Sequence, residues 1–242
     1  MTETTLNDSS MDFSYLDENY KRIKDNIEKA ALSVGRNPDE VTFMAVTKTI
    51  SPQPINHVLS LGVRLIGENK VQELLSKLEF LNTDGVDMHI IGHLQSNKVR
   101  KIADIVSMVQ SVDSVELAEE IAKRSLAVNR TMDVLLEVNI GCEFSKTGFS
   151  LEEIKERACE INEIENVNVR GLMAIPPVCE GEEVRRYFAD MKKLHTDIKS
   201  LLNNKADFDV LSLGMSADYA EAVKEGSTLV RVGSSLFGAR RY

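Results

Sequence analysis

A lysine at the end of an apolar run is the first residue in this sequence with clear chemical potential. Lys48 closes the run VTFMAVTK (41–48), although lysine is among the residues least often buried. A lysine amine becomes a nucleophile where desolvation or nearby cations lower its pKa, and it can then condense with an aldehyde. The alternative is a lysine that extends along the surface and keeps its ammonium group in solvent.

Two segments near the C-terminus have the composition of a phosphate site. SLGMSADYAEAV (212–223) supplies a glycine, hydroxyl groups and the start of a short helix, and helix N-termini attract anions. VGSS (232–235) adds a glycine that lets the backbone approach a phosphate closely. Alternatively, Ser216 merely caps a helix and Gly233 merely turns the chain. The similar character of the two segments favours the phosphate interpretation.

The elements that must position these residues alternate between strand and helix. Near-continuous apolar strands are typical of a parallel sheet covered by helices. Eight such units in about 200 residues predict an α/β fold with a single, closed (β/α)8 barrel of the TIM type. The alternative is an open doubly wound sheet, but no Gly-x-Gly-x-x-Gly follows the first strand, which disfavours a dinucleotide-binding version. The predicted strands are 41–47, 64–69, 87–92, 104–112, 133–140, 168–175, 208–214 and, with its exit loop, 228–238.

An extra helix is expected before the barrel. Apolar residues from Leu16 to Val34 recur at helical spacing, and Gly35 and Pro38 end the pattern. We expect residues 1–11 to form a flexible lead-in and residues 12–242 to form one domain. The polar N-terminus lacks the basic and apolar regions of a secretion signal. No apolar run approaches the roughly 20 residues that span a bilayer.

Composition narrows the classes of protein further. The net charge of −9 over 242 residues argues against binding to nucleic acid or to anionic membranes. Cys142, Cys159 and Cys179 are odd in number and widely spaced, which suits a cytoplasmic protein with neither disulfides nor a zinc site. No cluster has metal-ligand spacing. We expect a monomer, with a dimer as the alternative.

In a barrel, functional residues gather at the C-terminal ends of the strands. A reactive lysine and a phosphate cradle at one barrel mouth suit pyridoxal 5′-phosphate (PLP), which carries an aldehyde, a phosphate and a pyridine nitrogen. The polar residues expected at these ends are Lys48, Glu68, Asn69, His93, Asn139, Ser212, Gly214, Ser216, Arg231, Gly233 and Ser234.

From about residue 41 to residue 242, the chain resembles the pyridoxal phosphate homeostasis proteins, which are single-barrel relatives of bacterial alanine racemase. The match is highly specific because several of the shared strings are long and unusual. The strings are AVTKT (45–49), GENKVQE (67–73), IGHLQSNK (91–98), GLMAIP (171–176) and LSLGMSADYAEAVKEGSTLVRVGSSLFGAR (211–240).

The resemblance implies a cofactor site with PLP held covalently as a Schiff base on Lys48. Arg231 matches the position that faces the pyridine nitrogen. A guanidinium stays charged and only donates hydrogen bonds, so it would keep that nitrogen unprotonated and weaken the ring as an electron sink. His93 is alternatively a packing residue. The implied phosphate contacts are Ser212, Ser216, Gly233 and Ser234 with the backbone around Met215, and the residues near the ring are Asn69, His93 and Met173.

The resemblance also implies a protein that binds PLP without catalysis, buffers or delivers it, and affects amino-acid and vitamin B6 balance. Alanine racemase uses a second, β-rich domain and a tyrosine base from it, whereas this sequence stops at FGARRY (237–242). A racemase needs proton donors on both faces of its substrate. The alternatives are a PLP-dependent amino-acid racemase or lyase, and an interaction protein that PLP only stabilises. PLP-dependent apoenzymes are the expected protein partners.

Overall fold

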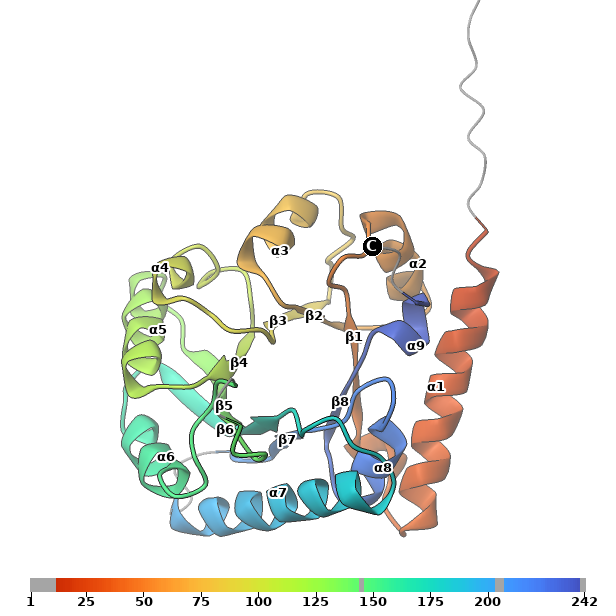
Figure 1. The fold of residues 1–242 in the computed structure, drawn as a ribbon. Helices are drawn as coiled ribbons and strands as arrows, with labels where there is room; N and C mark the ends of the chain where they lie inside the picture. Colours follow the sequence, from red (N-terminus) through yellow and green to blue (C-terminus); the bar gives the residue numbers. More distant parts are fainter. Residues whose placement is uncertain (1–11, 144–145, 203–206, 240–242) are drawn as a thin grey trace, which may run out of the picture.

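The computed structural model describes residues 12–143, 146–202 and 207–239, and its centre is a closed barrel of eight parallel strands (Figure 1). The strands follow one another around the barrel in chain order, and β8 closes it by pairing with β1. The predicted TIM-type barrel is therefore confirmed. The strands are β1 (Thr42–Val46), β2 (Leu65–Glu68), β3 (Asp87–Ile90), β4 (Met108–Val112), β5 (Met132–Val138), β6 (Val167–Ala174), β7 (Val210–Ser212) and β8 (Leu229–Val232).

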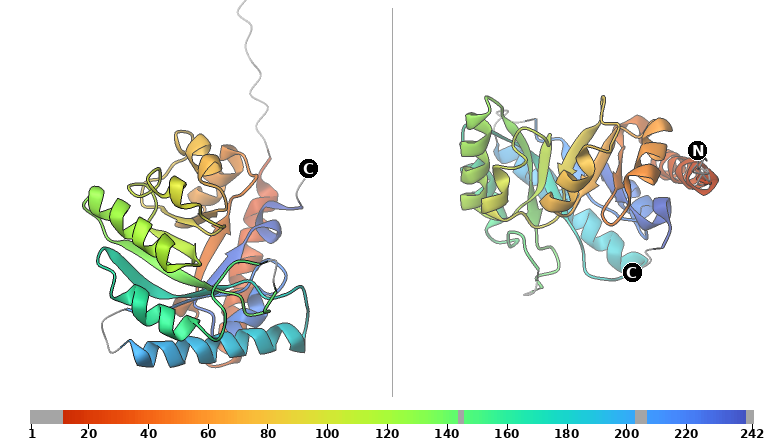
Figure 2. Two further views of the ribbon diagram at one scale, coloured as in Figure 1. Left: turned by 60° about the vertical axis from the view of Figure 1, so that its left-hand side comes forward. Right: turned by 90° about the horizontal axis from the view of Figure 1, so that it is seen from above.

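Helices surround the barrel and cover the outer faces of its strands (Figures 1 and 2). Their apolar faces and the outward residues of the strands form one continuous core, as parallel strands buried on both faces require. In the described part of the chain no helix is long and apolar enough to cross a membrane. The helices are α2 (Pro52–Ser60), α3 (Val71–Leu78), α4 (Ser96–Val99), α5 (Val115–Ala127), α6 (Ile154–Asn162), α7 (Glu182–Leu201), α8 (Tyr219–Lys224) and α9 (Ser234–Phe237).

The expected N-terminal helix is α1 (Ser14–Ser33), which lies along the outside of the barrel beside α8 and α9 (Figure 2). It buries Leu16, Ile23 and Ile27. The Asn26 amide donates to the Tyr219 hydroxyl at 3.0 Å and ties α1 to α8. Beyond α1, the short 3₁₀ helix η1 (Pro38–Glu40) leads into β1. The predicted lead-in, residues 1–11, lies outside the described residues.

Two strand boundaries differ from the sequence prediction by more than two residues. Residues 104–107 were expected to begin the fourth strand, but the chain turns there and β4 begins at Met108. Val106 is fully buried in that turn, so its apolar character reflects burial and not strand structure. After β8, the expected exit loop contains α9, which buries Leu236 and Phe237. Short apolar runs cannot distinguish a buried strand from a buried turn or helix.

The inside of the barrel combines apolar and polar side chains. One apolar cluster includes Met44, Val46 and Ile91, and another contains Met108, Leu135 and Met173. Four polar side chains are buried with them: His89, Gln110, Ser212 and Arg231. Because buried polar groups need hydrogen-bond partners, these four polar side chains must find partners inside the barrel. They lie directly beneath the candidate site.

Candidate functional site

A cavity of about 290 Å³ opens where β1, β2 and β8 end. Its walls come from loops that are far apart in the sequence and that barrel closure brings together. The lining contains seven of the predicted site residues: Lys48, Asn69, Met215, Ser216, Arg231, Gly233 and Ser234. It also contains four residues that the sequence reasoning did not name, Val46, Ile91, Ile175 and Ala217.

Three predicted site residues do not line this cavity. Met173 is buried in the barrel interior, in a cluster with Met108 and Leu135. Ser212 is fully buried beneath Arg231. His93 is exposed and lies beside Asp113, with Nδ1 3.1 Å from Oδ2. His93 and Ser212 were predicted from their positions at strand ends, and Met173 from the family resemblance, but side-chain direction separates all three from the cavity.

His93 instead lines an adjoining cavity of about 340 Å³, together with Glu137 and Asn139. The two cavities share the walls Asn69, Ile91 and Ile175. Burial raises the pKa of the Glu137 carboxyl, and a hydrogen bond from Thr147 opposes the shift in part. A carboxyl with a raised pKa and an exposed histidine therefore lie next to the candidate site.

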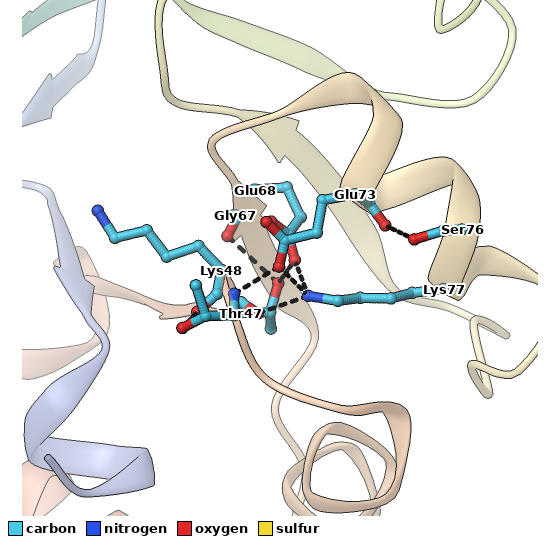
Figure 3. A network of polar contacts seen from close by, with 8 residues as sticks. Thr47, Lys48, Gly67, Glu68, Glu73, Ser76 and Lys77 are labelled. Atoms are coloured by element: carbon cyan, nitrogen blue, oxygen red, sulfur yellow. Dashed lines mark hydrogen bonds and ion pairs between the residues drawn. The ribbon is translucent and has the colours of Figure 1, made fainter. Parts of the chain in front are cut away.

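Lys48 reaches the first cavity from the end of β1. It is half-buried, and its side chain extends away from a network of polar contacts behind the strand (Figure 3). Glu68, which the sequence suggested as part of the barrel mouth, belongs to that network and lines neither cavity. The lysine is thus the cationic side chain that β1 directs into the cavity.

Ser216 organises the side of the cavity formed by the loops after β7 and β8. Its Oγ accepts the backbone N–H groups of Gly233 and Ser235, each at 3.1 Å. A serine hydroxyl has two acceptor lone pairs and one donor hydrogen. With both lone pairs used, the Ser216 hydroxyl can offer a ligand only its hydrogen. The Met215 N–H already donates to Oδ1 of Asp218 at 2.6 Å.

Gly214 shows why this loop needs a glycine. Its φ of 87° lies in the left-handed region, which side chains with a Cβ rarely adopt. An added Cβ would lie 2.6 Å from the Cβ of Ala222 and 2.9 Å from the Cα of Tyr219. Glycine therefore allows the β7 loop to fold tightly against α8, which brings Ser216 to the cavity.

Arg231 forms the floor of the cavity and is only 3% exposed. Its NH1 donates to the carbonyl of Ser212 at 2.7 Å and to the Ser212 hydroxyl at 2.6 Å, and NH2 donates to the carbonyl of Ala174 at 3.0 Å. Burial lowers its pKa to about 10, while the charges of Asp218 and Glu137 act in the opposite direction. The guanidinium is therefore still charged at neutral pH.

A chain of hydrogen bonds continues from Arg231 through the barrel interior. Because a guanidinium only donates, the Ser212 hydroxyl accepts from it and directs its own hydrogen to Oε1 of Gln110, at 2.7 Å. Nε2 of Gln110 then donates to Nδ1 of His89, at 2.9 Å. Burial lowers the pKa of His89 to about 3, so the ring is neutral and carries its hydrogen on Nε2.

Neither Gln110 nor His89 was predicted from the sequence. The available signal was a polar residue inside an otherwise apolar strand, as in DMHI (87–90) and MVQSV (108–112). The chain of hydrogen bonds through Ser212, Gln110 and His89 explains how Arg231 is held in place. Among the described residues, no group of three or more His, Cys, Asp and Glu side chains could hold a metal ion.

Similar proteins are found over most of this chain. Residues 19–241 match the family model of the alanine racemase N-terminal domain. A pyridoxal phosphate homeostasis protein of Aquifex aeolicus is 39% identical over 226 residues, which are 93% of this chain and 98% of that protein. The protein of the same name from Escherichia coli K12 is 37% identical over 93% of this chain and 96% of its own length.

A solved structure is also similar. PipY of Synechococcus elongatus PCC7942, determined with PLP bound, has a TM-score of 0.77 and 30% sequence identity, over 88% of this chain and 100% of that chain. The range 19–241 includes all eight strands of the barrel and every residue of the first cavity. The chain therefore belongs to the pyridoxal phosphate homeostasis proteins, a family built on the alanine racemase N-terminal domain.

Proposed function

We propose that this protein binds PLP in the cavity at the ends of β1 and β8 and acts in intracellular PLP homeostasis, without turnover of its own. One observation supports this most directly. Lys48 lies in the same cavity as Ser216, Gly233 and Arg231. An amine that can react with an aldehyde, a hydroxyl donor for a phosphate and a donor for a ring nitrogen are thus available to one small molecule.

The residues present fit PLP in each of its parts. When bound, PLP supplies an aldehyde and an electron-accepting ring. Lys48 would hold the cofactor covalently through that aldehyde, because its side chain is an amine that can condense with a carbonyl when it is unprotonated. The hydrogen of the Ser216 hydroxyl would point to the phosphate, since its lone pairs are occupied. Val46, Ile91 and Ile175 give the cavity apolar walls for the ring.

Arg231 supports a role without turnover. The guanidinium stays charged at neutral pH and has no lone pair to accept a proton. A pyridine nitrogen that faces it accepts a hydrogen bond and stays unprotonated, which weakens the ring as an electron sink. We therefore propose storage or delivery of PLP, with PLP-dependent apoenzymes as recipients. The widely spaced cysteines suit the cytosol as its location.

The alternative is a PLP-dependent amino-acid racemase or lyase. The raised pKa of Glu137 beside His93, in a cavity that adjoins the first, is the observation that favours it, because a proton donor beside a cofactor is what such chemistry needs. Turnover of D- or L-amino acids that is lost with Lys48→Ala would establish this alternative. No turnover of either set supports the binding role.

Borohydride reduction tests the attachment site. The protein is loaded with PLP, its absorbance spectrum is recorded, and the reduced protein is digested for peptide mass mapping. We expect a visible absorbance band and a reduced pyridoxyl group on Lys48. Lys48→Ala should lose both, while Lys123→Ala, an exposed lysine on α5, should keep both. A reducible group at the same site in Lys48→Ala would show that the assignment is wrong.

A further inference from the structure

The polar network behind β1 is built around Lys77 of α3 (Figure 3). Its Nζ donates to the carbonyl of Thr47 at 2.9 Å, to Oε1 of Glu68 at 2.8 Å and to Oε1 of Glu73 at 2.6 Å. An ammonium group has three donors, so these three contacts use all of them. The Lys77 side chain is only 10% exposed, which shields the contacts from solvent.

Glu73 makes a second contact with the same stretch of backbone. Its Oε1 accepts the N–H of Thr49 as well as the bond from Lys77. Thr49 has a φ of 66°, a left-handed conformation that is unusual for a β-branched residue. Burial acts to raise the pKa of Glu73, but the bonds from Lys77 and Thr49 hold it below its usual value. The carboxylate is thus ionised when it holds the Thr49 amide.

The two contacts hold the chain on both sides of Lys48. Lys77 binds the carbonyl of the peptide unit before Lys48, and Glu73 binds the N–H of the peptide unit after it. Peptide units are planar, so holding both fixes the two backbone dihedral angles of Lys48. The direction of its Cα–Cβ bond is then determined, and the side chain extends to the other side of the strand (Figure 3).

Glu73 and Lys77 can act together because they are four residues apart on one face of α3, where they also form an ion pair. Glu68 anchors Lys77 from β2 and accepts the Thr47 hydroxyl at 2.8 Å. Burial raises the pKa of Glu68, although Lys77 and Thr47 oppose the shift. The contacts therefore form a closed ring that joins α3, β2 and the end of β1.

Building on the proposed role of Lys48, we propose that Glu73 and Lys77 are positioning residues for this lysine. They orient its backbone toward the cavity before any ligand arrives. A group that is already oriented loses less conformational freedom when it forms a bond. The ring thus favours the covalent step at Lys48 specifically, and it does not contribute to the noncovalent contacts at Ser216 or Arg231.

Glu73→Ala tests the proposal, because the Glu73 side chain is 22% exposed. Truncation of Lys77 would leave Glu68 buried without its cation and would destabilise the fold. The probes are PLP and 4′-deoxypyridoxine 5′-phosphate, which lacks the aldehyde. We expect PLP to bind about tenfold more weakly, as for the loss of a charge-assisted hydrogen bond. The deoxy compound should bind unchanged.

Two further variants control this measurement. Glu73→Gln keeps an oxygen that can accept the Thr49 N–H, and it should restore part of the PLP affinity. Glu120→Ala removes a matched ion pair on α5. Glu120 and Arg124 are also four residues apart, and Nε of Arg124 lies 2.6 Å from Oε1 of Glu120. That variant should bind both compounds like the wild type. Equal weakening of both compounds by Glu73→Ala would overturn the proposal.

Hydrogen exchange tests the ring without any ligand. In the unloaded protein, the Thr49 amide should exchange faster in Glu73→Ala than in the wild type or in Glu120→Ala. Unchanged exchange would show that the ring does not hold this backbone. That result would overturn the positioning role of Glu73 and Lys77 but not the proposed binding of PLP. Failure of wild-type Lys48 to carry a reduced pyridoxyl group would overturn the proposed function, and the positioning role with it, whatever the exchange result.

Discussion

Truncation of the Ser212 hydroxyl should destabilise the protein far more than its size suggests. Ser212→Ala removes an acceptor for Arg231 NH1, at 2.6 Å, and the donor for Oε1 of Gln110, at 2.7 Å. Arg231 keeps its bond to the Ser212 carbonyl at 2.7 Å, whereas Oε1 of Gln110 loses its donor in a fully buried position. A buried polar group left without a partner costs about 1–3 kcal/mol.

The free energy of unfolding should therefore fall by about 2–4 kcal/mol once the lost bond to the guanidinium is included. For a chain of this size, Tm should fall by roughly 2–4 °C for each kcal/mol. Gln110→Leu alone leaves Nδ1 of His89 without its donor and the Ser212 hydroxyl without its acceptor. The double variant, Ser212→Ala with Gln110→Leu, leaves only Nδ1 of His89 without a partner. Its loss should be smaller than the sum of the single losses by about 1 kcal/mol or more.

Urea unfolding of the cofactor-free proteins measures these differences from the midpoint and the m-value, and omitting PLP prevents ligand binding from masking them. Ser200→Ala is the control, because the Ser200 hydroxyl donates only to the Thr196 carbonyl on the exposed side of α7. Its effect should stay within about 0.5 kcal/mol. Losses in the double variant that equal the sum of the single losses would refute the connected chain beneath Arg231.

Two further predictions concern stability. Gly171→Ala should lower the free energy of unfolding by at least about 3 kcal/mol, because its Cβ would lie 1.7 Å from the Val210 carbonyl oxygen. Gly85→Ala is the control, because nothing lies within 4 Å of its added Cβ, and it should lose about 1–2 kcal/mol. Equal decreases in the free energy of unfolding, measured in urea, would contradict the steric reason. Burial, aided by Lys192 and Lys199, lowers the pKa of His195 from 6.5 to about 4. Its contribution to stability is thus complete above pH 6.5 and falls by up to about 3 kcal/mol as the pH drops toward 4. In His195→Phe, the free energy of unfolding in urea should therefore decrease less between these two pH values, by up to this amount. An unchanged dependence of that free energy on pH would contradict the prediction.

Much of the architecture was predictable from local patterns. The alternation of apolar strands with amphipathic helices indicated eight units and hence a closed barrel, because parallel strands with helical crossovers have few compact solutions. Ser150 and Glu153 have the spacing of a capping box, and the Ser150 N–H donates to Oε1 of Glu153 at 2.8 Å. The helix α6 nevertheless begins at Ile154. Local signals identify an element more reliably than its ends.

The sequence by itself determined the elements and the chemical types at the strand ends. Lys48, Ser216 and Gly233 were identified in this way, since barrel function gathers at those ends. Whether each side chain lines the cavity depends on its direction, which alternates along a strand. That is why Met173 lies among apolar side chains inside the barrel, and Ser212 lies beneath Arg231 and does not line the cavity.

Only the tertiary structure decided which polar groups pair with one another. Gln110 meets Ser212 across 102 positions of sequence, and Lys77 meets the carbonyl of Thr47 across 30. No local propensity reports such pairs, because they depend on how the strands are staggered and where α3 packs. Burial then determines the charge states, since desolvation makes His89 neutral. The lysine could be found in the sequence, but the contacts that aim it could not.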